Sequence, residues 1–241
     1  MFSTGVLIQL VISLPSFLIT TTATPVCPSP KVPEASILKD TMNAFAIGGV
    51  VPDLLPEFTP VAMMRVEYFT LPSQPVRHSF LSRPTGPSIL DTRATYHSHS
   101  LSPHQPPSQA LSTDSDYTFI MLDPDVPSRI NSTLGPARHM LATGVKLKTN
   151  DPYFDLDFPV KPLSPYFPPA PPEATGFHRY TFLLYYGQPS PESIQDFDRK
   201  YPSRYNFDLR QFVAEAGLCD PIAGTFMFTE NSKDEAETLV H

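Results

Sequence analysis

The chain has 241 residues, of which 41% are hydrophobic and 17% charged, and its formal net charge is −7 at pH 7. This length fits one large domain or one domain with long insertions. Because the charge is negative and no run of Lys and Arg occurs, nucleic acid and anionic membrane surfaces are excluded as expected partners. The 30 prolines exclude a mostly helical protein, since proline breaks helices and central strands alike.

Residues 1–23 are predicted to be a secretory signal peptide. Residues 6–19 are mostly apolar, and the small residues at 21–23 form a plausible cleavage site. No Lys or Arg precedes the apolar stretch, so an uncleaved anchor and a frayed N-terminus stay open as alternatives. The stretch is short and interrupted, so we expect a secreted protein with no transmembrane span in the mature chain.

Two further features fit export. The chain has two cysteines, Cys27 and Cys219, near the two ends of the mature chain, and we expect a disulfide between them. The alternative is two unpaired thiols, with Cys219 buried as a small hydrophobe. Asn131 begins an Asn-Ser-Thr glycosylation sequon, which is used only if the chain is secreted and Asn131 is exposed.

The rest of the chain predicts one domain over residues 32–229, followed by a frayed acidic tail at 230–241. In chain order the expected elements are a helix at 32–45, a strand at 61–69, an inserted Ser/Pro/His-rich loop at about 83–116, a strand at 117–122, a proline-dense loop at 152–172, a strand at 180–186, a short helix at 191–200, a helix at 206–217 and a closing strand at 224–228. Asn206 is the expected cap of the last helix and Gly217 its end. The fold class is therefore dominated by β-structure, with a few peripheral α-helices.

Polar residues gather where strands end. The apolar run at 119–122 stops at Asp123-Pro124-Asp125, and Pro127 follows in the same turn. His139 comes sixteen residues after Asp123, and His178 leads into the strand that begins near Tyr180. A rigid scaffold presents side chains at such positions.

These segments resemble the phosphatidylethanolamine-binding protein family. The motif Asp-Pro-Asp-x-Pro-Ser-Arg at 123–129, the His at 139 and Gly-x-His-Arg before an aromatic strand at 176–180 occur in the family's order and spacing. The resemblance runs from about residue 44 to 228 and has the character of a secreted fungal-type member. It implies a β-sandwich with a small cavity at one end of the sheets, which binds phospholipid head groups or other small phosphate-like anions.

Carried over residue by residue, the resemblance implies that five residues line this cavity: Asp123, Pro127, His139, His178 and Tyr180. A protein partner such as a protease is also implied. The chain departs from the family at its pocket loop, where Pro168, Pro169 and Ala170 stand in place of glycines, so backbone amide donors are lost. The insertion at 83–116 is unusual, and the acidic tail has no clear counterpart of the C-terminal helix that closes the cavity in mammalian members.

The residue types support this reading independently. Asp123 is a suitable acceptor for one nitrogen of His139 or His178, which would favour the charged imidazole and leave the opposite N–H for a phosphate oxygen. The same carboxylate suits an ethanolamine ammonium. Asp125 and Arg129 are predicted to form a structural pair, and Arg179 is predicted to bind a carboxylate such as that of Asp125.

Two alternatives compete with a binding protein, namely a hydrolase and a metal-dependent enzyme that uses the Asp/His cluster. No Gly-x-Ser-x-Gly motif, no nucleophile at a motif position and no Gly-rich phosphate loop occur. The His residues at 97, 99 and 104 lie in the inserted loop, away from the expected strands. We therefore expect no catalytic residue, no metal and no cofactor.

Overall fold

The computed structural model describes residues 36–70, 73–76, 96–102, 111–150 and 153–231. The elements in chain order are α1 (Ser36–Ile47), α2 (Val50–Asp53), β1 (Ala62–Thr70), β2 (Ser73–Val76), β3 (Tyr96–Ser102), β4 (Tyr117–Asp123), β5 (Ala137–Asn150), β6 (Tyr153–Asp157), β7 (His178–Tyr186), α3 (Pro191–Gln195), α4 (Phe197–Lys200), α5 (Leu209–Ala216) and β8 (Pro221–Thr229). The expected signal peptide, Cys27 and residues 232–241 lie outside the described residues. Within the described ranges, no helix combines the length and the apolarity needed to cross a membrane.

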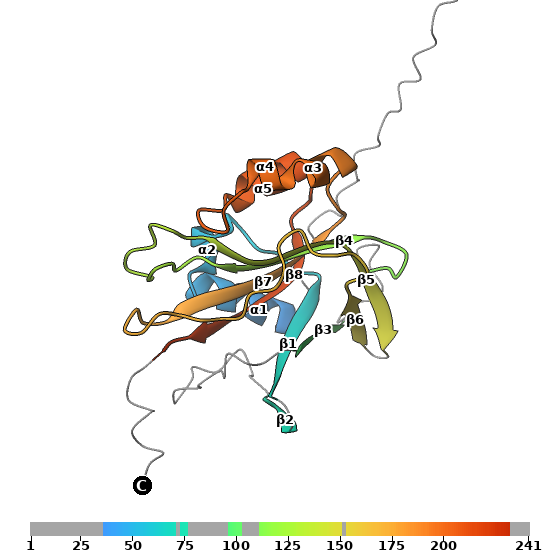
Figure 1. Cartoon of the computed structure of the whole chain (residues 1–241). Helices are drawn as coiled ribbons and strands as arrows, with labels where there is room; N and C mark the ends of the chain where they lie inside the picture. The colour runs from blue at the N-terminus through green and yellow to red at the C-terminus, as the bar shows by residue number, and fades with distance from the viewer. Residues whose placement is uncertain (1–35, 71–72, 77–95, 103–110, 151–152, 232–241) are drawn as a thin grey trace, which may run out of the picture.

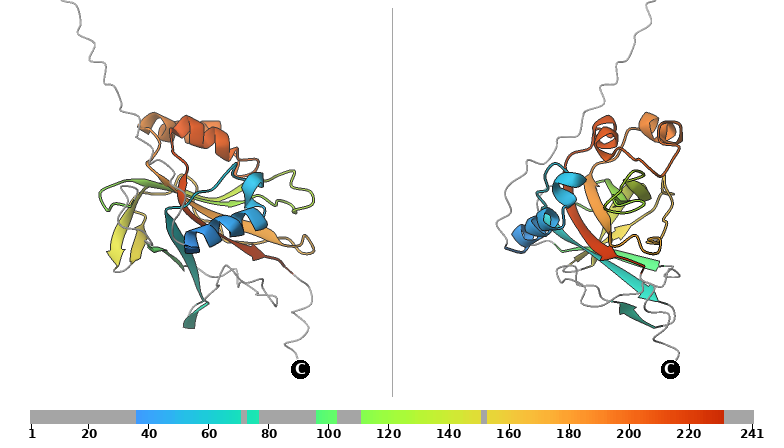
Figure 2. Two further views of the ribbon diagram at one scale, coloured as in Figure 1. Left: turned by 180° about the vertical axis from the view of Figure 1, so that it is seen from behind. Right: turned by 90° about the vertical axis from the view of Figure 1, so that its left-hand side faces the viewer.

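The strands form one eight-stranded sheet in the order β2-β1-β3-β6-β5-β4-β7-β8. Neighbours in this order are antiparallel, and β8 also pairs with β1 in parallel, so the sheet curls back on itself (Figure 1). The helices lie outside the curl, with α1 and α2 on one side and α3 to α5 on another (Figure 2). The predicted fold class, β-dominated with a few peripheral helices, is confirmed.

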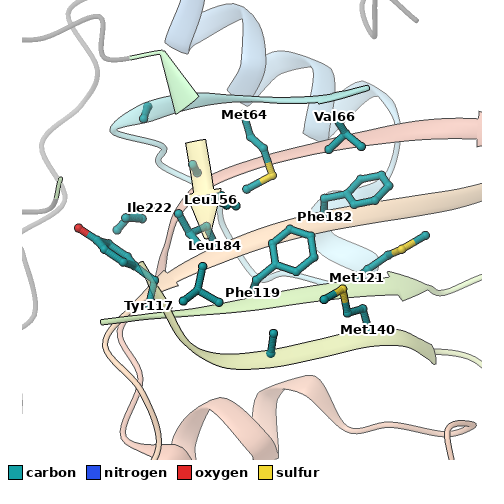
Figure 3. Packing of buried hydrophobic residues seen from close by; sticks show 14 of the residues in the cluster. Met64, Val66, Tyr117, Phe119, Met121, Met140, Leu156, Phe182, Leu184 and Ile222 are labelled. Carbon is teal, nitrogen blue, oxygen red and sulfur yellow. The ribbon is translucent and has the colours of Figure 1, made fainter. Parts of the chain in front are cut away.

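Strand β4 is buried on both faces, which explains its uninterrupted apolar run. Phe119 and Met121 point into the curled sheet, where they join residues of β1, β7 and β8 (Figure 3). Ile120 and Leu122 point to the opposite face and pack with residues of the helices. Successive side chains alternate between the two faces, so neighbouring residues of β4 and β7 serve two different cores.

Two stretches that were predicted to be loops contain strands. Tyr96–Ser102 forms β3, which pairs with β1 and β6, and Tyr153–Asp157 forms β6, which pairs with β5. The longest strand, β5, was not predicted at all. These strands are polar or proline-flanked and are fixed by their pairing partners, which local sequence does not reveal.

The last helix begins later than expected. The residue that caps α5 is Asp208, whose side chain accepts a hydrogen bond from the Gln211 amide at 2.9 Å. The prediction of Asn206 as the cap is wrong, because Asn206 adopts a left-handed conformation (φ 54°) before the helix starts. Gly217 ends the helix in a left-handed conformation (φ 64°), as predicted.

Candidate functional site

The end of β4 and the start of β7 are neighbours. These strands pair in antiparallel register, with Leu122 opposite Thr181, so Asp123 and His178 come close to each other. The loop after β4 and the loop before β7 lie together at the left-hand end of the sheet in Figure 1. The two sequence motifs thus meet at one end of the domain.

Asp123 and His178 form a buried pair. The Oδ2 atom of Asp123 lies 2.7 Å from Nδ1 of His178, and the side chains are 2% and 1% exposed. The Oδ1 atom of Asp123 accepts the amide N–H of Asp125 at 2.9 Å. The predicted contact between Asp123 and a histidine is therefore made by His178. The second nitrogen of His178 was expected to face the ligand, but Nε2 lies 3.0 Å from Oγ1 of Thr175.

Tyr180 lies between the two histidines. Its ring stacks on that of His178, with centroids 6.4 Å apart, and meets the His139 ring edge-on at 5.0 Å. Its hydroxyl accepts the Ala170 amide at 3.1 Å and hydrogen-bonds to Asp123. Burial, and then the negative charge of Asp123, raise the pKa of Tyr180, so this hydroxyl stays protonated at neutral pH.

His139 reaches the site through a β-bulge. Met121 pairs with Met140 whereas the next residue of β4, Leu122, pairs with Arg138, so His139 is the extra residue of β5. Bulges change the direction of a side chain and are frequent next to functional sites. The bulge turns the His139 ring toward Tyr180, whereas the guanidinium of Arg138, its neighbour in sequence, packs over the Phe197 ring of α4.

The environment of His139 favours its neutral form. Burial lowers the pKa of His139, and hydrogen bonding to the Phe167 carbonyl offsets this only in part. Its Nδ1 lies 2.9 Å from that carbonyl oxygen, and because a carbonyl only accepts, Nδ1 carries the hydrogen. In the neutral ring Nε2 is then an acceptor. The positive charge of Arg204 also lowers this pKa.

The second carboxylate of the turn has a different partner. Arg179 donates to Oδ2 of Asp125 from Nε at 2.8 Å and to Oδ1 from Nη2 at 2.6 Å, and the two side chains are 3% and 1% exposed. Arg179 also donates to the carbonyl oxygen of Gly49 at 2.6 Å and to Asp53 at 2.8 Å. We call Asp125 and Arg179 the clasp, since they fasten the turn to α2. The predicted ion pair between Arg179 and Asp125 is confirmed.

The predicted pair of Asp125 and Arg129 is replaced by another contact. Arg129 donates to the carbonyl oxygen of Gly48 at 3.1 Å, whereas the Arg179 guanidinium binds both carboxylate oxygens of Asp125. Arg129 thus joins the clasp in holding the turn against the end of α1.

The pocket loop offers few amide donors, as predicted. Proline occupies four of its positions and has no N–H; these are Pro168, Pro169, Pro171 and Pro172. The amide of Ala170 is bound to Tyr180, and that of Phe167 donates to the carbonyl of His139 at 2.8 Å. The four prolines and these two amides therefore offer no free donor to an anion.

The remaining predicted residues lie as follows. Pro127 is half-buried in the turn after β4, and its contact with a ligand stays a prediction. Asn131 is exposed in the loop that follows, which satisfies one of the two conditions for glycosylation. Cys219 is buried, and its pairing with Cys27 stays a prediction. Among the described residues, no group of three or more His, Cys, Asp or Glu is arranged to hold a metal ion.

A separate hollow of about 300 Å³ lies between α2, the end of the β4–β5 loop and the start of α5. Its lining includes Asp53, Phe207 and Arg210 and contains none of the predicted ligand residues. Asp53 also binds Arg179, so this hollow adjoins the clasp. It is not the site of the two histidines.

Sequence reasoning missed Thr175, Arg204 and Phe167. Thr175 contacts His178, Phe167 contacts His139, and Arg204 donates to the carbonyl oxygen of Arg138 at 3.0 Å beside His139. Thr175 stands three residues before His178, immediately before the Gly-x-His-Arg segment, so its closeness in sequence was available as a signal. Arg204 is distant in sequence, and only the folded chain brings it near.

The molecule is thus a β-domain with a buried polar site at the ends of its strands, bordered by a proline-rich loop. Residues 85–227, more than half of the chain, match the family described as phosphatidylethanolamine-binding protein. The chain belongs to the phosphatidylethanolamine-binding protein family.

Solved structures and curated relatives agree with this assignment. The structure of carboxypeptidase Y inhibitor complexed with its cognate proteinase shares 24% identity and a TM-score of 0.60, covering 82% of this chain and 98% of that one. The phosphatidylethanolamine-binding protein from Plasmodium vivax shares 18% identity and a TM-score of 0.54, covering 79% and 97%. At these identities the likeness establishes the fold.

Among curated relatives, CEN-like protein 1 of Nicotiana tabacum is 30% identical over 112 residues, which are 46% of this chain and 57% of that protein. A Drosophila melanogaster relative is 33% identical over 117 residues, covering 46% and 50%. The chain spans about half the length of the curated relatives it matches.

Proposed function

We propose that this protein is a non-enzymatic binding protein that holds a small phosphate-bearing molecule, such as a phospholipid head group, at Asp123, His139, His178 and Tyr180. The observation that carries the proposal is the buried Asp123–His178 pair at the strand ends. Burying an ionisable pair is expensive and contributes little net stability. Such pairs at the end of a scaffold are therefore candidates for binding sites.

A zwitterionic head group suits these residues. Imidazole N–H groups are donors for phosphate oxygens, and the carboxylate of Asp123 is an acceptor for an ammonium group. Three donors already contact that carboxylate, from Asp125, His178 and Tyr180. A carboxylate has about four lone-pair sites, so one is left for a ligand cation.

The hydrogen-bond directions argue against a hydrolase. Asp123, His178 and Thr175 stand in the order of orienting acid, base and nucleophile. However, Thr175 donates its hydroxyl proton to the carbonyl oxygen of Pro172 at 2.7 Å, so that proton is not directed at His178. His178 donates to Thr175 and does not act as its base.

Two further aspects of the proposal concern context. Inhibition of a carboxypeptidase is a second candidate function, supported by the likeness to carboxypeptidase Y inhibitor; an assay of carboxypeptidase Y with purified protein tests it. Secretion is supported by the sequence of residues 1–23 and by the exposed sequon at Asn131. Sequencing the N-terminus of the protein recovered from culture medium tests secretion and cleavage together.

Calorimetric titration with glycerophosphoethanolamine tests the main proposal. We expect Asp123→Asn to weaken binding by about tenfold or more, because hydrogen bonds to charged groups contribute roughly 1.5–3 kcal/mol. Asp157→Asn is the matched control, because Asp157 lies on β6 and pairs with Lys148 at 3.0 Å. The affinity of this variant for the probe should equal that of the wild type. Inorganic phosphate as a second probe separates a head-group site from a general phosphate site. A wild-type protein that binds neither probe would overturn the proposal.

A further inference from the structure

Both ring nitrogens of His178, Nδ1 of His139 and the Ala170 amide already have partners within the protein. His178 is bound through Nδ1 to Asp123 at 2.7 Å and through Nε2 to Thr175 at 3.0 Å. The Ala170 amide donates to Tyr180, and Nδ1 of His139 is bound to a carbonyl oxygen. An anion that binds one of these groups must therefore replace its internal partner.

Thr175 is the partner that accepts from His178. Its hydroxyl lies 2.7 Å from the carbonyl oxygen of Pro172 and has one hydrogen, which must point at that carbonyl. The Thr175 oxygen consequently accepts the Nε2–H of His178. A neutral hydroxyl oxygen thus occupies the position where an anionic oxygen would bind the imidazole.

The loop that carries Thr175 is exposed and held in an unusual backbone conformation. Ala174 and Gly176, on either side, have positive φ angles of 59° and 77°. A residue other than glycine rarely adopts such an angle, and a Cβ at Gly176 would meet no atom within 4 Å. The two left-handed residues therefore set the direction of Thr175 toward His178. Thr175 is half-buried, whereas its neighbours Ala174 and Gly176 are exposed.

We propose that Thr175 is a specificity-determining residue, which occupies the ligand's position on His178 and yields it only to an anionic oxygen. This inference rests on the proposed function of the same site. Charged acceptors form shorter and stronger hydrogen bonds than neutral ones, so a phosphate displaces the hydroxyl while an uncharged phosphoryl or alcohol oxygen does not. The other internal acceptors are less easily replaced, because Asp123 is charged and the Phe167 carbonyl belongs to the backbone that pairs with β5.

Thr175→Val tests the inference, since valine keeps the shape and removes the hydroxyl. Glycerophosphoethanolamine is the anionic probe and trimethyl phosphate the neutral one, both titrated by calorimetry. Loss of one competing hydrogen bond should raise the affinity for the anionic probe by roughly three- to tenfold. The affinity for the neutral probe should rise by a larger factor, so that the preference for the anionic probe narrows. Thr175→Ser retains the hydroxyl and should behave as the wild type.

Thr181→Val is the matched control. Thr181 lies on the same strand as His178, and its hydroxyl donates to a backbone carbonyl oxygen at 3.3 Å, so its removal should leave both affinities unchanged. The His178 ring proton adds a measurement without ligand: its exchange with water should become faster in Thr175→Val and stay slow in Thr175→Ser.

The outcomes separate the two proposals. Unchanged or weaker binding by Thr175→Val, with binding by the wild type intact, overturns the role of Thr175 and leaves the proposed function standing. No binding by the wild type and by Thr175→Val overturns the proposed function and this inference with it.

Discussion

The carboxylates of Asp123 and Asp125 bind two adjacent basic residues, His178 and Arg179. The first pair lies in the candidate ligand site, whereas the second pair is structural. Arg179 engages Asp125 with two hydrogen bonds and uses its remaining donors on Gly49 and Asp53. A guanidinium remains charged at all relevant pH values and fits a carboxylate with fixed geometry. The clasp therefore holds the turn against α2 at all of these pH values.

The pair of Asp123 and His178 is arranged differently. One nitrogen of His178 is bound to Asp123, and the second is held by the hydroxyl of Thr175 on an exposed loop. Under the proposal above an anionic ligand replaces that contact, whereas each contact of the clasp is to a carboxylate or a backbone carbonyl. The comparison teaches that burial alone does not separate a binding site from a structural ion pair, and that the partners of the buried groups must be compared as well.

The largest effect is expected when the clasp is broken. Arg179→Leu leaves Asp125 buried without its counter-charge, and removing one partner of a buried ion pair costs about 3–5 kcal/mol. Urea unfolding measures this loss. Arg179→Lys keeps the charge and loses the two-point contact, so we expect an intermediate loss. A change in unfolding free energy below about 1 kcal/mol in Arg179→Leu would show that the clasp contributes no more to stability than an exposed ion pair does.

The candidate ligand site is tested next by the pH dependence of its affinity. A phosphodiester such as glycerophosphoethanolamine keeps its charge between about pH 5 and 8, so any change in affinity reports on the protein. Protonation of His139 adds a donor at Nε2, and affinity should therefore fall as pH rises. Because burial lowers the pKa of His139 from 6.5, most of this change should lie below pH 6.5.

His139→Asn provides the comparison for this titration. Asparagine retains a donor for the Phe167 carbonyl and does not titrate in this range, so the pH dependence should become flatter. If the wild-type affinity is independent of pH, His139 is not an anion donor.

The same histidine should also affect stability. Its pKa in the folded protein is lowered from 6.5, so the unfolded chain binds the proton more readily. The contribution of neutral His139 to stability is present above pH 6.5 and is lost as pH falls through the folded pKa. Urea unfolding at about pH 7.5, 6.5 and 5.5 should show decreasing stability, with a shallower decrease in His139→Asn. An equal decrease in both proteins would assign the effect to other groups.

The smallest effect is expected at the outer edge of the clasp. Asp53 lies 2.8 Å from Arg179, but its side chain is 52% exposed. Exposed pairs contribute about 0–1 kcal/mol, so Asp53→Asn should change the unfolding free energy by less than about 1 kcal/mol. If Asp53→Asn lowered the unfolding free energy as much as Arg179→Leu does, Asp53 would be as important to the clasp as Asp125.

The sequence alone determined the β-dominated class, the apolar strands β4 and β7 and the grouping of Asp123, His139 and His178. These features are local or follow from a motif: an apolar run of this length predicts a buried strand, and a Pro-bracketed turn predicts where it ends. The loss of amide donors in the pocket loop was also readable, because proline has no N–H wherever it stands.

Only the tertiary structure decided that His178 and not His139 binds Asp123, and that Arg129 does not bind Asp125. The alternation of side chains along β7 places His178 and Tyr180 inside the curled sheet and Arg179 outside it. The bulge that directs His139 toward Tyr180 arises from the pairing of β5 with β4, and local sequence does not encode pairing register. Strand β3 likewise depends on contacts between distant segments, which form only when the sheet closes.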